Sequence, residues 1–157
     1  MKKQKGFSLI ELLIVVAIIL IIAAIAIPNL LKSKMAANES SAVGSIRTIN
    51  TGEVTYAAGC PNIGYSATLI ELNTGALCAA GTNIIDNVLA TGNKSGYTFN
   101  YQPLADASGL FTTYTLTALP QTVGTTGQRG FFSDQTAVIR YSLNGSTAPT
   151  AASSALQ

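Results

Sequence analysis

Apolar and polar residues are divided unevenly along this chain. A run of sixteen uncharged, mostly apolar residues extends from Leu12 to Ile27. The sequence that follows carries few charges and is rich in Thr, Ser, Asn, Ala and Gly. The first segment is typical of a membrane span, and the second of a small globular head. The chain length predicts one modest domain in addition to this span.

Residues 29–56 keep a helical period after the apolar run. Apolar residues fall on one side of this helix at steps of 4, 7, 4 and 3, at Leu31, Met35, Ala42, Ile46 and Ile49. This pattern predicts an amphipathic continuation of the helix, whose apolar stripe needs a sheet to cover it. The prediction weakens after Ile49, because Asn50-Thr51-Gly52 is typical of a helix terminator.

Beyond Gly92 the period becomes two, which is typical of strands. The predicted strands are centred on residues 97–101, 113–118, 131–132 and 138–143, with Ile139, Tyr141 and Leu143 on one face of the last. The helix and these strands predict an α+β fold. In it, a long N-terminal helix packs against a small, roughly four-stranded antiparallel sheet.

The pattern divides the chain into six segments. The first two are a leader and a membrane-spanning helix, and the third is the amphipathic helix. A connector follows, in which residues 67–72 could form a short helix, and then the sheet and a mobile tail. The expected bounds are 1–6, 7–28, 29–56, 57–95, 96–143 and 144–157.

The charge balance does not indicate a nucleic-acid partner. The formal net charge is +2, but the three lysines of residues 1–6 account for it, and without them the side-chain balance is −1. Gln128-Arg129-Gly130 with Arg140 forms a small basic feature. A surface role or a contact between subunits explains it better than DNA binding, which requires a denser basic patch with aromatic residues.

The composition also argues against catalysis and against a metal or cofactor. The chain has no histidine, so the commonest general base and metal ligand is missing. Asp86, Asp106 and Asp134 stand too far apart in sequence to form a spaced calcium loop. Two thiols, Cys60 and Cys78, do not complete a tetrahedral site. A disulfide between them is the natural interpretation for an exported chain, with two free thiols as the alternative.

Three interpretations fit the N-terminus: a secretory signal cut after Ala26, a plain membrane anchor, or a precursor leader of another kind. Glu11 separates them. A carboxylate in an apolar helix costs about 2.5–3.5 kcal/mol at the centre of a membrane, and ordinary signals and anchors gain nothing by carrying one. A cut after Ala26 would also leave Pro28 at the second mature position, which makes a poor substrate.

Residues 5–19, Lys-Gly-Phe-Ser-Leu-Ile-Glu-Leu-Leu-Ile-Val-Val-Ala-Ile-Ile, resemble the leader and helix start of type IV pilins and type II secretion pseudopilins. The resemblance continues to Pro28 and covers roughly the first 30 residues. It implies the pilin fold, cleavage between Gly6 and Phe7 by a prepilin peptidase, and N-methylation of Phe7. It also implies that Glu11 neutralises the Phe7 amine of a neighbouring subunit during assembly.

The resemblance further implies a location and partners. The lysines of the leader keep the N-terminus cytoplasmic by the positive-inside rule. Residues 7–27 span about 31 Å as a helix, enough to cross the inner membrane, and Pro28 is expected to kink the helix where it leaves the membrane. The head is then periplasmic until an inner-membrane assembly platform adds the subunit to a pilus on the cell surface or to a periplasmic pseudopilus.

The head leaves the subfamily open. Both cysteines precede the expected sheet, whereas the best-known pilins carry a C-terminal disulfide-bounded loop. The calcium-binding loop of major pseudopilins has no evident counterpart. The leading expectation is a structural pilin of a type IV pilus-like filament. The alternatives are a pseudopilin of a type II secretion system and a membrane-tethered binding head that does not polymerise.

Overall fold

The computed structural model describes residues 7–75 and 83–156. The chain divides into two compact units, residues 1–34 and 35–157. Helix α1 (Leu9–Gly59) contributes to both, and Pro28 lies inside it. The first unit, as far as it is described, consists of residues 7–34 and is helical from Leu9 onward.

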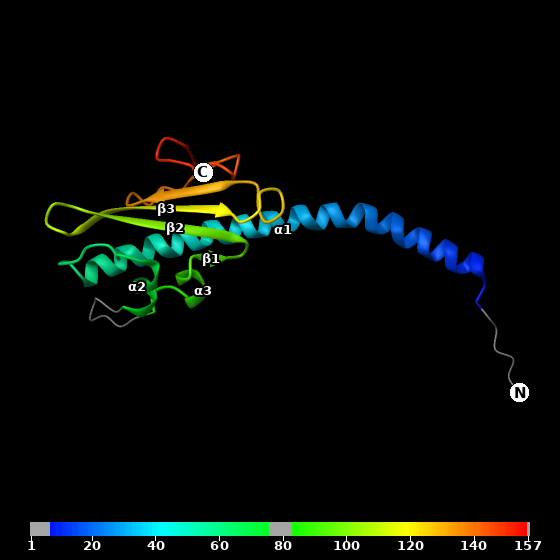
Figure 1. Cartoon of the computed structure of the whole chain (residues 1–157), viewed down its shortest axis with the longest axis horizontal. Coiled ribbons are helices and arrows are strands. Elements are labelled where there is room, and N and C mark those ends of the chain that lie inside the picture. Colours follow the sequence, from blue (N-terminus) through cyan, green and yellow to red (C-terminus); the bar gives the residue numbers. More distant parts are fainter. Residues whose placement is uncertain (1–6, 76–82, 157) are drawn as a thin grey trace, which may run out of the picture. The chain divides into compact units, whose positions relative to one another are not determined.

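The second unit is the head, an α+β domain that confirms the predicted fold class. The C-terminal part of α1 packs against one face of an antiparallel sheet, and the short helices α2 (Leu69–Thr74) and α3 (Asn87–Ala90) lie between them in sequence (Figure 1). The six strands follow one another in chain order across the sheet. Their bounds are β1 Asn93–Lys94, β2 Tyr97–Ala105, β3 Phe111–Pro120, β4 Gly130–Asp134, β5 Arg140–Ser142 and β6 Ser154–Ala155.

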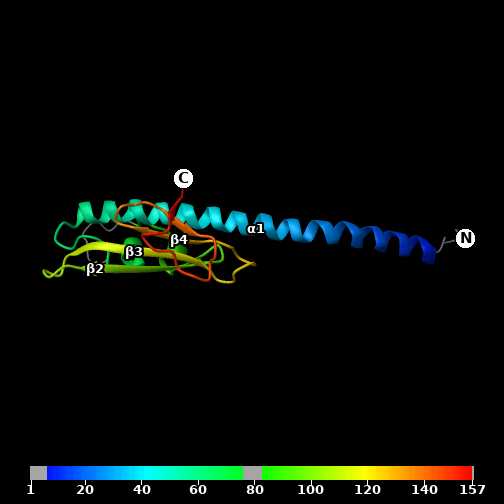
Figure 2. The same ribbon diagram turned by 90° about the horizontal axis from the view of Figure 1, so that it is seen from above.

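The core of the head lies between α1 and the inner face of β2, β3 and β4. Alternation along the strands buries one set of side chains and leaves the other set on the outer face. The predicted stripe of α1 meets the buried set, because Ala42, Ile46 and Ile49 are all buried. Leu31, which the stripe included, belongs to the first unit and is exposed. Viewed from above, the strands run alongside the C-terminal part of α1 (Figure 2).

Helix α1 continues through residues 50–52, where the prediction weakened, and ends at Gly59, three residues beyond the predicted bound of 56. The Asn50 side chain does not cap the helix. Its amide donates to Ser133 Oγ at 2.8 Å, and its Oδ1 accepts from Tyr114 Oη at 3.0 Å. Gly52 faces Ile84 so closely that a Cβ at this position would lie 2.9 Å from Cγ2 of that residue. Asn50 and Gly52, two of the residues typical of a helix terminator, therefore make tertiary contacts inside α1 instead.

The sheet has two more strands than the roughly four that were predicted. β1 and β6 have two residues each, too short to show a period in the sequence. β5 is shorter than the predicted 138–143. Ile139, just before β5, is buried and Tyr141 is half-buried, but Leu143 is 73% exposed, so the predicted shared face holds for the first two residues only.

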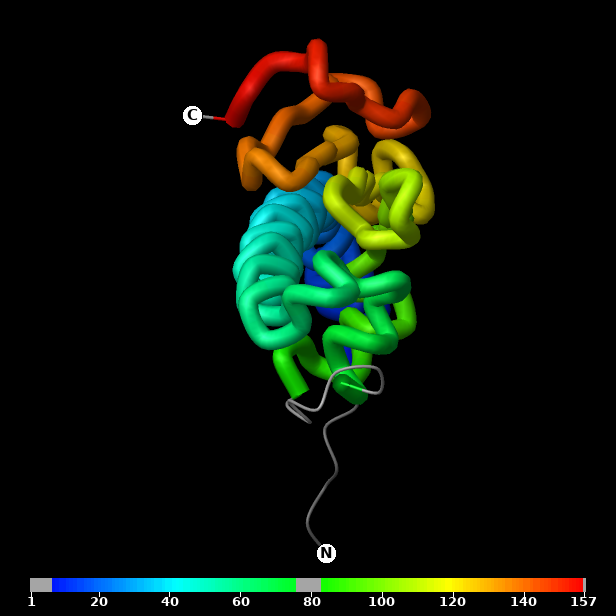
Figure 3. The backbone as a smooth tube through the Cα atoms, turned by 90° about the vertical axis from the view of Figure 1, so that its left-hand side faces the viewer, coloured from blue at the N-terminus to red at the C-terminus, as the bar shows by residue number. Residues whose placement is uncertain are grey.

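The segment expected to be a mobile tail folds back on the head instead. Within it, β6 pairs with β5, and Leu156 N donates to Ile139 O at 2.7 Å. Leu156 also packs against the core, and Gly145 N donates to Gln128 O at 2.8 Å. The end-on view shows this segment (red) lying beyond β4 and β5 (Figure 3). Small polar residues carry no periodic signal, so this packing could not be predicted from the local pattern.

The predicted short helix in the connector is present as α2, two residues later than expected. Thr68 caps its N-terminus by accepting from Glu71 N at 3.3 Å, and Gly75 closes its C-terminus in the left-handed conformation at φ 63°. A side chain with a Cβ adopts this conformation with strain, whereas glycine adopts it freely. The turn glycine therefore sets the end of this helix.

Candidate assembly site on the N-terminal helix

The side chain of Glu11 caps the start of α1. The helix begins at Leu9, and the Ser8 backbone N–H donates to Glu11 Oε2 at 2.9 Å. The first helical bond, from Leu12 N to Ser8 O, measures 3.2 Å. This bond is half of a capping box, in which the carboxylate three residues after the N-cap accepts from the N-cap backbone N–H. That N–H has no acceptor within the helix. The negative charge in the first turn also interacts favourably with the positive end of the helix macrodipole.

Only one of the two Glu11 oxygens is used in this cap. Among the described residues, no hydrogen bond or ion pair reaches Oε1. Phe7, 72% exposed, directly precedes Ser8. The carboxylate is thus held in a defined position with one oxygen available for a further donor.

Behind Glu11 the helix presents an uncovered apolar surface. Within α1 lies one stretch long and apolar enough to cross a membrane, and none of it is buried inside the molecule. Ten Leu and Ile residues between positions 9 and 22 have exposed fractions above 50%: Leu9, Ile10, Leu12, Leu13, Ile14, Ile18, Ile19, Leu20, Ile21 and Ile22. Soluble monomers rarely expose so large a continuous apolar surface, so this segment requires lipid or other helices around it.

Helix α1 continues through Pro28. Proline has no backbone N–H, so the carbonyl of Ala24 loses the donor it would have in an ordinary helix. In the next turn two side chains donate to backbone carbonyls four residues earlier: Asn29 Nδ2 to Ile25 O at 3.1 Å, and Ser33 Oγ to Asn29 O at 3.0 Å. The kink expected at Pro28 stays a prediction.

Two predicted features fall partly outside the described residues. Gly6, the residue before the expected cut, is one of them, so the cleavage site stays a prediction. Cys78 is another. Cys60 is buried in the core of the head, where it follows the end of α1. The Cys60–Cys78 disulfide also stays a prediction.

Comparison with known proteins points to one family. The model of a family described as "Prokaryotic N-terminal methylation motif" matches residues 1–27, the segment that holds Gly6, Phe7 and Glu11. The N-terminal segment of this chain is therefore similar to the segment that this family model describes.

Two curated proteins each match a part of the chain. The type IV wide pilus major component PilA4 of Thermus thermophilus is 60% identical over 40 residues, 26% of this chain and 30% of the relative. The type IV major pilin protein PilA of Myxococcus xanthus is 44% identical over 54 residues, 34% of this chain and 24% of the relative. The matches thus span less than a third of either relative. No solved structure matches the chain significantly.

The head contains a charged contact that the sequence did not reveal. Glu39, on α1, forms an ion pair with Arg129, whose Nε lies 2.7 Å from Glu39 Oε2. Glu39 Oε1 accepts from the backbone N–H groups of Gln128 and Arg129, at 2.8 and 3.1 Å. Burial acts to raise the pKa of this carboxyl, but the hydrogen bonds from Gln128 and Arg129 outweigh it and lower the pKa. The partners are 90 residues apart, so no local pattern indicates the pair.

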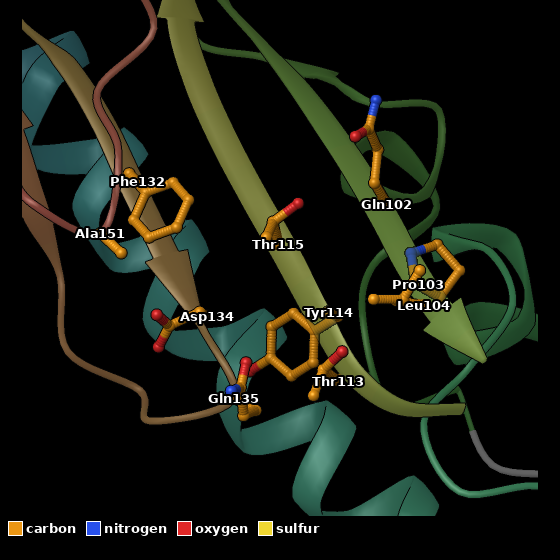
Figure 4. Close-up of a pocket in the computed structure, with 10 residues that line it drawn as sticks. All are labelled: Gln102, Pro103, Leu104, Thr113, Tyr114, Thr115, Phe132, Asp134, Gln135 and Ala151. Atoms are coloured by element: carbon orange, nitrogen blue, oxygen red, sulfur yellow. The ribbon is translucent and has the colours of Figure 1, made fainter. Parts of the chain in front are cut away.

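The outer face of the sheet carries a groove of about 440 Å³ (Figure 4). Its lining mixes polar and apolar side chains, with Phe132 at one side and residues of β2, β3 and the end of β4 around it. Asp134 Oδ1 accepts from Thr136 N at 2.9 Å, so this carboxylate caps the turn after β4. The groove residues are Gln102, Pro103, Leu104, Thr113, Tyr114, Thr115, Phe132, Asp134, Gln135 and Ala151. None of them pairs a nucleophile with a base.

Proposed function

We propose that this chain is a structural pilin subunit that polymerises through α1 into a type IV pilus-like filament. The exposed apolar surface of residues 9–27, behind a single carboxylate, is the observation that carries the proposal. Copies of this helix packed side by side remove the apolar surface from water or lipid and bury it against itself. The names of both relatives, a wide pilus major component and a major pilin, support the same function.

Processing precedes assembly in this proposal. A prepilin peptidase cuts between Gly6 and Phe7 and methylates the new amine of Phe7. Glycine suits the position before the cut, since a missing Cβ lets the protease approach the backbone closely. The family match over residues 1–27 supports this step. Mass spectrometry of the mature N-terminus tests it, and a chain that starts at Ile27 would instead indicate ordinary secretion.

Glu11 then selects the docking position. Two opposite unit charges about 4 Å apart attract by about 4 kcal/mol at an effective dielectric of 20. The Phe7 amine of one subunit is therefore attracted to the Glu11 carboxylate of its neighbour. Either group can belong to the incoming subunit. The Ser8 N–H holds Oε2, and Oε1 accepts the amine.

The remaining partners follow from the membrane segment. The leader lysines orient the precursor with its N-terminus in the cytoplasm and its head in the periplasm. An inner-membrane assembly platform extracts the subunit into the filament. The chain acts without a cofactor and has no enzymatic role of its own.

Replacement of Glu11 by Ala tests the proposal against a tethered, non-polymerising head. We expect Glu11→Ala chains to be cut at Phe7 and to reach the membrane, but to form no filaments. Filaments at the wild-type level with normal processing would disprove the assembly role of Glu11. A pseudopilin of a type II secretion system would show the same Glu11 dependence, with loss of protein secretion in place of loss of surface pili.

A further inference from the structure

A groove that contains two arginines runs along the exposed side of α1 in the head. We call it the arginine groove. It has a volume of about 410 Å³ and is lined by Ala36, Glu39, Ser40, Val43, Gly44, Arg47, Arg129 and Leu156. Gly44 keeps it open, since nothing lies within 4 Å of the position that a Cβ would take there.

Arg129 is held in a fixed orientation at the edge of this groove. Its Nε is bound to Glu39, and its guanidinium carbon lies 5.7 Å from the centroid of the Phe131 ring and 5.9 Å from that of Tyr141. Among the described residues, nothing binds its two terminal amino groups. A guanidinium fixed through Nε presents these groups in the geometry that a carboxylate takes up in a bidentate pair.

Arg47 supplies the second positive charge. It is exposed, and in the described part of the chain it has no hydrogen bond or ion pair. Glu39 is the one acid of the groove, and Arg129 with two backbone N–H groups already binds both of its oxygens. The groove therefore carries a net positive charge and two guanidinium groups with donors to spare.

The opposite charge is found at the hairpin tip, which we define as residues 106–110 between β2 and β3. Asp106 Oδ1 accepts from Ser108 N at 2.8 Å, Ser108 Oγ at 2.6 Å and Leu110 N at 3.1 Å. These bonds lower the pKa of the Asp106 carboxyl and keep it ionised. They leave Oδ2 without a partner among the described residues, on a turn whose residues 106–109 are exposed.

The hairpin tip lies at one end of the sheet, and the arginine groove extends from Arg129, near the other end, along α1 as far as Arg47. The tip directly precedes β3, whereas the loop that ends at Arg129 follows it, and β3 has ten residues. At about 3.3 Å per residue the two ends are about 30 Å apart. Figures 1 and 2 both show the β2–β3 turn at one end of the sheet and the β3–β4 loop at the other.

We propose that the hairpin tip of one copy docks into the arginine groove of the next copy, where Arg47 and Arg129 bind the Asp106 carboxylate. The inference rests on the proposed filament function and names the contact between heads within it. A contact between two different surfaces of the same chain is heterologous, and repeated contacts of this kind build an open helical filament wherever the rotation does not close into a ring. Pairing of like surfaces would instead bring two positive grooves or two negative tips together.

The other acids of the head fit this role less well. Glu53 is fully buried, and Asp86 is paired with Lys94 at 2.7 Å. Glu71 is half-buried and accepts from Ala67 N at 2.8 Å. Asp134 is half-buried and lines the groove on the outer face of the sheet. Asp106 is exposed and has an available oxygen at an end of the head.

Charge reversal in the full chain tests the contact. Arg47→Asp and Asp106→Arg each place like charges at the interface. Close charge pairs at interfaces couple strongly, so each single variant is expected to lower the yield of sheared filaments at least about tenfold. The double variant restores opposite charges, and its yield is expected to return close to that of the wild type.

Matched variants separate the contact from folding. Asp106→Asn keeps the acceptor of the turn but removes the charge, and it is expected to lower the yield less than Asp106→Arg does. Asp134→Arg makes the same charge change elsewhere on the head and is expected not to rescue Arg47→Asp. Membrane levels of each subunit, measured by immunoblot, are expected to equal those of the wild type.

Two results would overturn the inference while leaving the filament function intact. One is wild-type filament yield in both single variants. The other is failure of Asp106→Arg to rescue Arg47→Asp, or rescue by Asp134→Arg in its place. In either case the wild type forms filaments and Glu11→Ala does not. A wild-type chain that forms no filaments under conditions of normal processing would overturn the proposed function and this inference together.

Discussion

Ser66 donates two hydrogen bonds to the carboxylate of Glu53, from its N–H to Oε2 at 2.9 Å and from its hydroxyl to Oε1 at 2.6 Å. Glu53 lies on α1 and has no exposed surface. Tyr101 Oη, from β2, donates to the Ser66 carbonyl at 2.8 Å. The contact therefore joins the helix, the connector and the sheet at one buried point.

This contact predicts a pH dependence of stability. Burial raises the pKa of the Glu53 carboxyl, and the hydrogen bonds from Ser66 offset only part of that effect. An acid with a raised pKa binds its proton more tightly in the folded state than in the unfolded state. The free energy of unfolding should therefore fall as the pH rises from the ordinary pKa of glutamate to the raised pKa of Glu53, and should level off above it.

Replacement of Glu53 by Gln removes this titration and keeps the shape of the side chain. We expect urea unfolding of the full chain in detergent to show a smaller loss of stability with rising pH in Glu53→Gln than in the wild type. The difference between the two chains isolates Glu53 from Glu39, Asp86 and Asp106, whose pKa values are lowered. Equal slopes in both chains would contradict the prediction.

Asn50 provides a second test of the buried polar contacts. Asn50→Ala leaves Tyr114 Oη without its acceptor and removes the donor to Ser133 Oγ. Unsatisfied buried groups cost about 1–3 kcal/mol, so the free energy of unfolding should fall by about that amount. Thr48→Ala is the matched control, because Thr48 is exposed and its hydroxyl bonds only to Gly44 O of its own helix. A loss in Thr48→Ala as large as that in Asn50→Ala would show that the buried bonds are not its cause.

Two glycines should respond in opposite directions to alanine. A Cβ at Gly127 would overlap the phenol ring of Tyr97, which is fully buried and donates to Arg129 O at 2.8 Å. Overpacking of this kind costs about 1–3 kcal/mol. Gly44→Ala adds a Cβ in open space inside a helix and should stabilise by about 0.5–1 kcal/mol. Thermal unfolding of both variants measures the contrast, and equal shifts in the melting temperature would argue against it.

The predicted disulfide can be tested chemically. If Cys60 and Cys78 are bridged, alkylation of the denatured full chain should add no mass before reduction and two labels after it. Loss of a native bridge from a small exported domain costs about 2–5 kcal/mol, so reduction should lower the midpoint of urea unfolding. Two labels without reduction would show that the thiols are free.

The sequence predicted those features of the fold that depend on residues close together in the chain. The alternation at Tyr97, Phe99 and Tyr101 marked β2, because one face of that strand is buried and the other is not. The motif around Glu11 was recognisable because a carboxylate in the apolar start of a helix is costly in a membrane and therefore indicates a function. These features depend on neighbours within a few positions in the sequence.

The remaining features depend on partners far along the chain. Asn50 and Gly52 suggested a helix end, but contacts with Ser133 and Ile84 hold them inside α1. Glu39 and Arg129 are 90 positions apart, and the sequence around either residue does not predict its contact with the other. The local pattern at Arg129 indicated only a surface position or a subunit contact.

The strand order of the head has a consequence for how the domain forms. Each strand of the sheet pairs only with the strands before and after it in the chain. No crossover has to close before the next strand can join, so the loop entropy of each addition is small. If the residues of the head cross the membrane in chain order, each strand can therefore join the sheet as soon as it has crossed. The bond from Asn50 to Ser133, in contrast, must wait for a strand made much later.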